Sequence, residues 1–251
     1  MARIYLTGRL AIEGPKGIVE EGELSGVQGR VAPAALVMAR GPISRDTLAN
    51  TVWGESTPPA GWDKALNSII SKLRAALASS GVDGRATLVS GSGAFELRRL
   101  GDLEVDIEQC TTAVDAAEGA LRHEDIPTAW ANAAIGTSIA RRPFLAGVYS
   151  DWVVAKREAI VDLHYRALEV LVGVWDAQGE VRQAVSAAEE LTRVERLCER
   201  GYRRLIELHG AAGDAASAQR VFVRCREELA ALGIEPSART TAAVHAAGGY
   251  V

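Results

Sequence analysis

The sequence predicts a mainly α protein in two parts, a small α+β domain at the N-terminus and an all-α domain after it. Three observations support this fold class. Short runs of alternating apolar and polar residues are confined to the first part, helix-period apolar spacing fills the rest, and 251 residues are too many for one small core. We expect domains over residues 1–103 and 106–248.

The first 24 residues predict a small antiparallel sheet. The runs "RIYLTG", "LAIEG" and "IVEEGEL" alternate, and Gly and Pro punctuate the turn "EGPKG" between the second and third. The following stretch, "SGVQGRVAPAALVMAR", predicts a helix. Because proline lacks an N–H and its ring crowds the carbonyl four residues earlier, we expect the regular part of this helix to begin near Pro33.

Two further helices and a hairpin follow in order. In "GPISRDTLANTVWG", Ser44 is a good N-cap and Gly54 ends a short helix. In "WDKALNSIISKLRAAL", the residues that recur at the spacing of one buried helix face are Leu66, Ile70, Leu73 and Leu77. The two alternating runs of "ATLVSGSGAFELRRL" predict a hairpin. This order is typical of a winged helix-turn-helix, whose third helix enters the major groove of DNA.

From Asp106 onward the pattern is helical throughout. We expect helices near residues 107–121, 126–139, 149–176, 180–192, 196–210, 214–232 and 237–246. The run "GEVRQA" at 179–184 recurs as "GDAASA" at 213–218, and the resulting offset of 34 residues is the tetratricopeptide period. We therefore expect tetratricopeptide-like stacking of helix pairs, with a generic helical bundle as the alternative.

Composition narrows the class of protein. No apolar run approaches the roughly 20 residues needed to cross a bilayer, so we expect a cytoplasmic protein without membrane contact. Three widely spaced cysteines, without a C-x-x-C pair, indicate core thiols: Cys110, Cys198 and Cys225. The four histidines share no spacing with cysteines or acids, and no nucleophile lies beside a base, so we expect neither a metal or other cofactor nor an enzyme.

Charge is divided unevenly along the chain. Residues 1–105 hold 12 Lys or Arg and 11 Asp or Glu, whereas residues 106–251 hold 16 and 21. Around the third helix, residues 59–80 hold Lys64, Lys72 and Arg74 against one acid, Asp63. Positive potential is therefore expected to concentrate where that helix lies.

The polar face of the third helix predicts DNA contact. Ser68, Ser71 and Lys72 point outward on neighbouring turns, toward base edges, and Asn67 can pair with adenine. Arg45, at the start of the second helix, is expected to contact a phosphate. The full predicted set is Arg45, Lys64, Asn67, Ser68, Ser71, Lys72 and Arg74. A solvated helix face with no ligand is the alternative.

These motifs resemble a known family. "GPISRDTLANTVWGESTPPAGWDKALNSIISKLRAAL" with "TLVSGSGAFELRRLGDLEVDIEQC" resembles the OmpR-type DNA-binding domain of the Streptomyces antibiotic regulatory proteins. "RRPFLAGVYSDWVVAKREAIVDLHYRALEVL" and "CREELAALGIEPSARTTAAVH" look like the bacterial transcriptional activation domain of that family. The resemblance implies a transcriptional regulator of the activator class that binds repeated promoter sequences through its third helix and recruits RNA polymerase or another protein through its helical domain.

Two other functions remain open at this stage. The wing tip "SGSG" carries no cation, which favours an adaptor whose degenerate winged helix no longer binds DNA. A small ligand held in a groove between helix pairs is the other alternative. Because a DNA-binding domain with a charge near +1 makes few phosphate contacts, we expect weak binding by a monomer and a need for dimerisation or adjacent repeats.

Overall fold

The computed structural model describes residues 1–24, 26–54 and 58–250. It divides into two compact units, each made of two stretches of chain. Unit 1 comprises Met1–Gln109 and Arg142–Ile160, and unit 2 comprises Cys110–Arg141 and Val161–Val251. Both sheets lie in unit 1 and unit 2 is helical, so the predicted fold class is confirmed.

The N-terminal sheet of unit 1 has the strand order β3-β2-β1-β7. Its strands are β1 (Ala2–Tyr5), β2 (Ala11–Gly14), β3 (Gly17–Glu20) and β7 (Leu103–Val105). The first three pair antiparallel, as predicted, and Ile4 opposite Ile12 is buried. The edge strand β7 runs parallel to β1, a pairing that the sequence did not predict.

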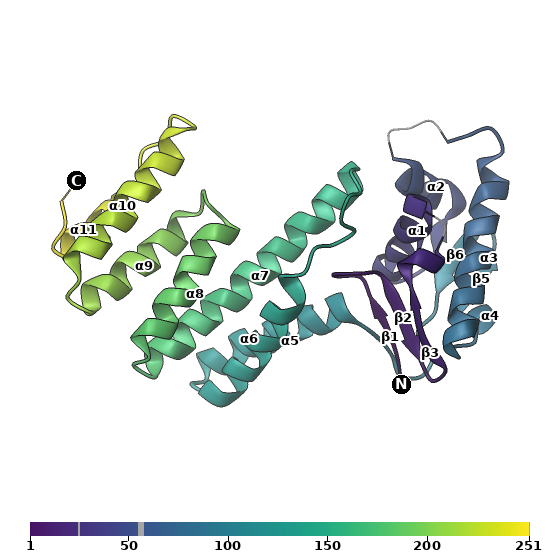
Figure 1. Cartoon of the computed structure of the whole chain (residues 1–251), viewed down its shortest axis with the longest axis horizontal. Coiled ribbons are helices and arrows are strands. Elements are labelled where there is room, and N and C mark those ends of the chain that lie inside the picture. Colours follow the sequence, from purple (N-terminus) through teal and green to yellow (C-terminus); the bar gives the residue numbers. More distant parts are fainter. Residues whose placement is uncertain (25, 55–57, 251) are drawn as a thin grey trace. The chain divides into compact units, whose positions relative to one another are not determined.

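Three helices form the helix-turn-helix part of unit 1, namely α1 (Gly26–Ala39), α2 (Arg45–Trp53) and α3 (Trp62–Ser80) (Figure 1). The expected start near Pro33 is wrong, because α1 begins at Gly26 and Pro33 lies inside it. Proline leaves the carbonyl of Gly29 without its helical donor. Residues 31–37 are all buried, and this packing offsets the lost hydrogen bond.

The wing is a second small sheet with the order β4-β6-β5. Its strands are β4 (Ile43–Ser44), β5 (Leu88–Gly91) and β6 (Ala94–Leu97), and a short helix, α4 (Gly84–Thr87), precedes β5. Ser92 and Gly93 connect β5 and β6 with φ angles of 51° and 76°. Two positive φ values in a two-residue loop are typical of a type I′ hairpin turn, so the predicted hairpin is confirmed.

A segment from later in the chain completes unit 1. Residues 142–160 hold the loop before α7 (Asp151–Ala177) and the first turns of that helix. Phe144 forms a β-bridge with Thr7, and the carbonyl oxygen of Pro143 accepts a hydrogen bond of 2.8 Å from the Gly8 amide. The Arg30 guanidinium donates to the Ala146 carbonyl over 3.1 Å. Unit 1 is therefore discontinuous in sequence.

A buried carboxylate links the ends of the neighbouring strands β1 and β7. Asp106 is 6% exposed and begins α5 (Asp106–Arg122), directly after β7. Its Oδ1 accepts from the amides of Leu6 and Ile107 at 2.9 and 2.8 Å. Its Oδ2 accepts from the Thr7 amide at 2.9 Å and the Thr7 hydroxyl at 2.7 Å. The carboxylate thus satisfies backbone groups at the end of β1 that would otherwise be buried without partners.

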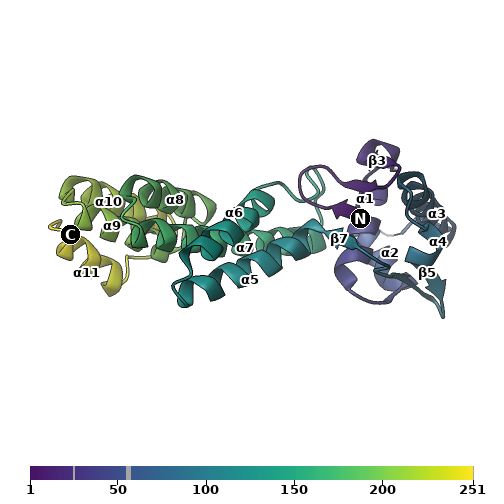
Figure 2. The same cartoon turned by 90° about the horizontal axis from the view of Figure 1, so that it is seen from below.

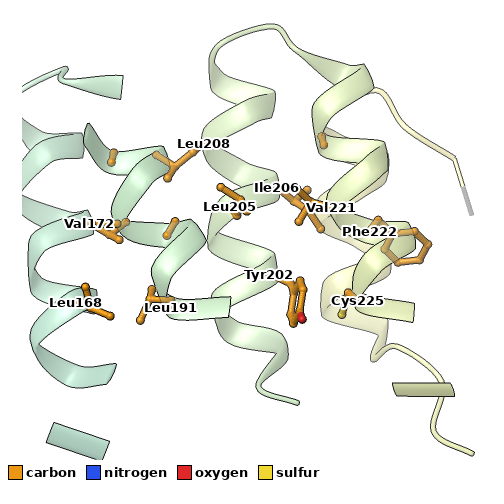
Figure 3. Packing of buried hydrophobic residues seen from close by; sticks show 14 of the residues in the cluster. Leu168, Val172, Leu191, Tyr202, Leu205, Ile206, Leu208, Val221, Phe222 and Cys225 are labelled. Carbon is orange, nitrogen blue, oxygen red and sulfur yellow. The ribbon is translucent and has the colours of Figure 1, made fainter. Parts of the chain in front are cut away.

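Unit 2 consists of helices that pack as successive pairs (Figure 2). Besides most of α5 and α7, they are α6 (Ile126–Ala140), α8 (Val181–Val194), α9 (Glu199–Ala211), α10 (Ala215–Ala230) and α11 (Ala238–Ala246). Figure 3 shows the core that extends from α7 through α8 and α9 to α10, with Leu168, Leu191, Tyr202 and Phe222 spaced along it. Cys225 is buried in the same core, as predicted for a core thiol.

The 34-residue repeat has a repeated structure. Gly179 and Gly213 have φ angles of 72° and 73°, and each turn closes with equivalent backbone hydrogen bonds. The Glu180 amide donates to the Trp175 carbonyl, and the Asp214 amide donates to the His209 carbonyl, 34 residues later in both partners. Ala184 and Ala218 are completely buried, which allows the helices to approach closely. The tetratricopeptide-like prediction is confirmed.

Candidate nucleic-acid interface

The third helix has one buried side and one polar side. Leu66, Ile70, Leu73 and Leu77 are each no more than 2% exposed and anchor α3 in the core of unit 1. On its other side, the exposed members of the predicted set are Lys64, Asn67, Ser68, Ser71 and Lys72. The structure therefore brings these residues together on one surface of α3, the arrangement that a major-groove helix requires.

Arg45 joins α2, α3 and the wing. Ser44 caps α2 by accepting a 3.0 Å hydrogen bond from the Thr47 amide, and the Arg45 amide donates to the Gly93 carbonyl at 3.0 Å. This backbone geometry places the Arg45 guanidinium 4.9 Å from the centre of the Phe95 ring. A cation over the face of an aromatic ring is attracted by the negative charge of that face.

The same guanidinium is hydrogen-bonded to the beginning of α3. Arg45 Nε donates to Asp63 Oδ1 over 2.9 Å, and Nη2 donates both to that oxygen and to Asn67 Oδ1, the latter over 3.0 Å. Asn67 Nδ2 in turn donates to Asp63 Oδ2 at 3.3 Å. Arg45 and Asn67 are therefore engaged with each other and with Asp63 in this structure.

Arg74 connects α3 to the wing. Its Nε donates to the Leu88 carbonyl at 2.9 Å, and its Nη2 donates to the Ser90 hydroxyl at 2.6 Å. Both partners belong to β5, so this guanidinium fixes the hairpin against α3. Of the cations predicted to contact DNA, Lys64 and Lys72 are exposed, whereas Arg45 and Arg74 are half-buried and hold the surface together.

Sequence reasoning missed three partners that shape this surface, namely Asp63, Ser90 and Phe95. Each is distant in sequence from the arginine it contacts, and no periodicity within one element could reveal these pairs. The one available signal was charge, because Asp63 is the acid that accompanies three cations in residues 59–80.

The helical unit contains a cleft between α7, α8 and α9. It has a volume of about 220 Å³ and is lined by Glu169, Val172, Leu191, Arg200, Arg203, Arg204 and Glu207. Arg200 is ion-paired with Glu169 at 2.8 Å, and Arg204 with Asp176 at 2.7 Å. Burial raises the pKa of Glu169, and the nearby Arg200 opposes that shift. The charges of this cleft are thus largely balanced by neighbouring side chains.

Residues 1–24, 26–54 and 58–250 contain no group of three or more His, Cys, Asp or Glu side chains that could hold a metal ion. None of the helices in these ranges is long and apolar enough to cross a membrane.

Comparison with known proteins identifies the second part of the chain. The family model of the bacterial transcriptional activator domain matches residues 105–247. A search of curated proteins gives no significant match. Among solved structures, Mycobacterium tuberculosis EmbR, in complex with a low-affinity phosphopeptide, is similar in fold, with a TM-score of 0.85 at 21% identity.

The similarity to EmbR covers nearly all of this chain but only part of the EmbR chain. It extends over 98% of this chain and 64% of that one, so the chain spans about two thirds of the EmbR length. The C-terminal TPR-containing domain of a Plasmodium falciparum protein described as FK506-binding gives a TM-score of 0.43 at 7% identity, over 57% of this chain and 88% of that one.

Proposed function

Because the chain belongs to the bacterial transcriptional activator domain family, and joins this domain to a winged helix as the Streptomyces antibiotic regulatory proteins do, we propose that it activates transcription by binding promoter DNA through α3. The observation that carries the proposal is the exposed surface of α3. It presents two lysines, two serines and Asn67 on one side of a helix whose other side is buried.

The geometry suggests a division of roles on this surface. Ser68, Ser71 and Lys72 occupy the middle of α3 and would meet base edges in the major groove. Lys64, one turn nearer the start of the helix, would meet a phosphate. Arg74 would act by holding the wing beside α3 through its bonds to β5.

Affinity of a single chain would be limited by charge. Each phosphate that a cation neutralises releases counterions, and the exposed α3 surface offers only a few such contacts. Binding of two chains to adjacent direct repeats would compensate, and this arrangement would be a dimer on DNA. The helical unit would then contact RNA polymerase or another protein of the transcription machinery.

The first experiment identifies the DNA and measures its contacts. Duplexes that the full chain binds would be selected from a random pool, and their affinities measured by fluorescence anisotropy at several salt concentrations. We expect Lys72→Gln to weaken binding and to reduce the slope of log K against log salt by about 1 if its ammonium meets a phosphate, or to relax base preference if it meets a base.

The matched control is Lys16→Gln, which removes the same charge from the exposed turn between β2 and β3. It should leave affinity and base preference unchanged. Equal losses in the two variants would contradict a specific role for α3.

A second candidate function is an adaptor that keeps the winged fold without binding DNA. Two observations favour it. The wing tip at residues 90–93 is uncharged, and Arg45 and Arg74 are both bonded within the protein. Failure of the chain to bind any selected duplex at low salt would favour the adaptor over the activator.

A further inference from the structure

Asp63 occupies an unusual position for an acid. It lies in the first turn of α3, on the surface where DNA would approach, and its side chain is 56% exposed. Its Oδ1 accepts two hydrogen bonds from Arg45, through Nε at 2.9 Å and through Nη2. One negative oxygen thus accepts from two neighbouring N–H groups of the guanidinium, a charge-assisted contact that a phosphate oxygen of DNA could also make.

The rest of Arg45 is arranged so that it can exchange partners. The Phe95 ring attracts the guanidinium whichever anion it binds. The hydrogen bonds of Arg45 use Nε and Nη2, so Nη1 has no hydrogen-bond partner among the described residues, and the side chain is 26% exposed. A partly exposed ion pair of this kind is weak, and a phosphate that releases counterions can replace the carboxylate.

We propose that Asp63 competes with DNA phosphate for Arg45 and so restrains phosphate binding by that side chain. The inference rests on the proposed DNA-binding function and deepens it. On a duplex that does not fit the α3 surface, Arg45 stays with Asp63 and the complex lacks one phosphate contact. On a duplex that fits, the other contacts bring a phosphate close enough to take Arg45 from Asp63, and the ion pair is broken. The internal pair therefore lowers affinity for both kinds of duplex, and the salt dependence of binding tells on which of them Arg45 has exchanged partners.

The test is Asp63→Asn, which removes the negative charge and retains the size of the side chain. With a scrambled duplex, the variant should gain one phosphate contact, so its salt slope should steepen by about 1 and its affinity at 0.1 M salt should rise by up to about fivefold, the most that a partly exposed ion pair withholds. With the selected duplex the salt slope should not change, because wild type already makes this contact, and affinity should rise because no ion pair has to be broken.

Two controls separate the exchange from simple repulsion between an acid and DNA. Asp46→Asn removes an equal charge from the exposed first turn of α2, where the Asp46 side chain bonds to none of the described residues. It should leave the salt slopes of both duplexes unchanged, because it releases no cation. In an Arg45→Gln background, Asp63→Asn should no longer steepen the salt slope, because no guanidinium is present to be released.

The outcomes distinguish failure of this inference from failure of the proposed DNA-binding function. Wild-type binding with an unchanged or reduced non-specific affinity in Asp63→Asn overturns the inference and leaves the proposed function standing. A steeper slope that persists in the Arg45→Gln background also overturns it. If neither wild type nor Asp63→Asn binds any duplex, the proposed function and the inference both fail. Because the expected effect is a gain of binding, a misfolded variant cannot imitate it.

Discussion

Replacing Asp106 with alanine should destabilise unit 1 strongly. The substitution removes the acceptor for the amides of Leu6 and Thr7 and for the Thr7 hydroxyl, and both residues are 1% exposed. A buried donor left without a partner costs about 1–3 kcal/mol. Three such donors, partly reached by water in the space that the carboxylate vacates, give an expected loss of about 3–5 kcal/mol. This is a large fraction of the roughly 5–15 kcal/mol that stabilises a typical domain.

Hydrogen exchange measured by mass spectrometry on the full chain is the appropriate assay, because a two-unit chain need not unfold in one step. Amides in β1 and β2 should lose protection in Asp106→Ala, whereas amides in α10 should keep theirs. The control is Asp102→Ala, an exposed acid four residues earlier. A loss of protection below about 1 kcal/mol in β1 would refute the reasoning, since it would mean that the four hydrogen bonds contribute little.

Three further predictions concern unit 2. A Cβ at Gly136 would lie 2.7 Å from Val114 Cγ2, so Gly136→Ala should destabilise the protein by about 1–3 kcal/mol. A Cβ at Gly119 would have its nearest neighbour at 3.9 Å, so Gly119→Ala should stabilise the protein by up to about 1 kcal/mol. Thermal melts of both variants check these changes. A hydrogen bond from Arg166 holds the pKa of Glu118 below its ordinary value of 4.5, so this pair contributes stability above about pH 4.5 and loses it as the pH falls further. Urea midpoints of wild type and Glu118→Gln should therefore converge at low pH, and a constant difference would contradict the assignment. Burial raises the pKa of Cys225 to about 11, so this thiol should resist iodoacetamide at pH 8 until urea unfolds the chain. Mass spectrometry detects the modification, and rapid modification of the native protein would be inconsistent with the buried position of Cys225.

Most of the fold prediction rested on the periodic spacing of apolar residues within single helices and strands. The spacing of Leu66, Ile70, Leu73 and Leu77 placed the buried side of α3 correctly, and Ser44 capped α2 as expected. The prediction failed at Pro33, where local preference disfavours a helix and tertiary packing imposes one. Strand β7 was also missed, because three residues carry little pattern and their partner β1 lies about 100 positions earlier.

The sequence predicted which residues of α3 share one exposed surface, but not how Arg45 is held beside them. Helix geometry was sufficient to gather Lys64, Ser68, Ser71 and Lys72 on one surface of α3. It could not show that Arg45 turns toward Asp63 and Phe95, because that arrangement depends on how α2, α3 and the wing meet in space. Whether these residues contact DNA stays a prediction.

The return of residues 142–160 to unit 1 bears on any attempt to obtain that unit by itself. A fragment ending near residue 105 would leave Thr7 and Arg30 without the chain that Phe144 and Ala146 supply, and would uncover apolar surface beside the sheet. Cleaving the intact protein within residues 123–125, in the turn between α5 and α6, would have a different result. Both halves would remain associated through the strand bridge and the side chains around it, so the nicked molecule should migrate as one species until it is denatured.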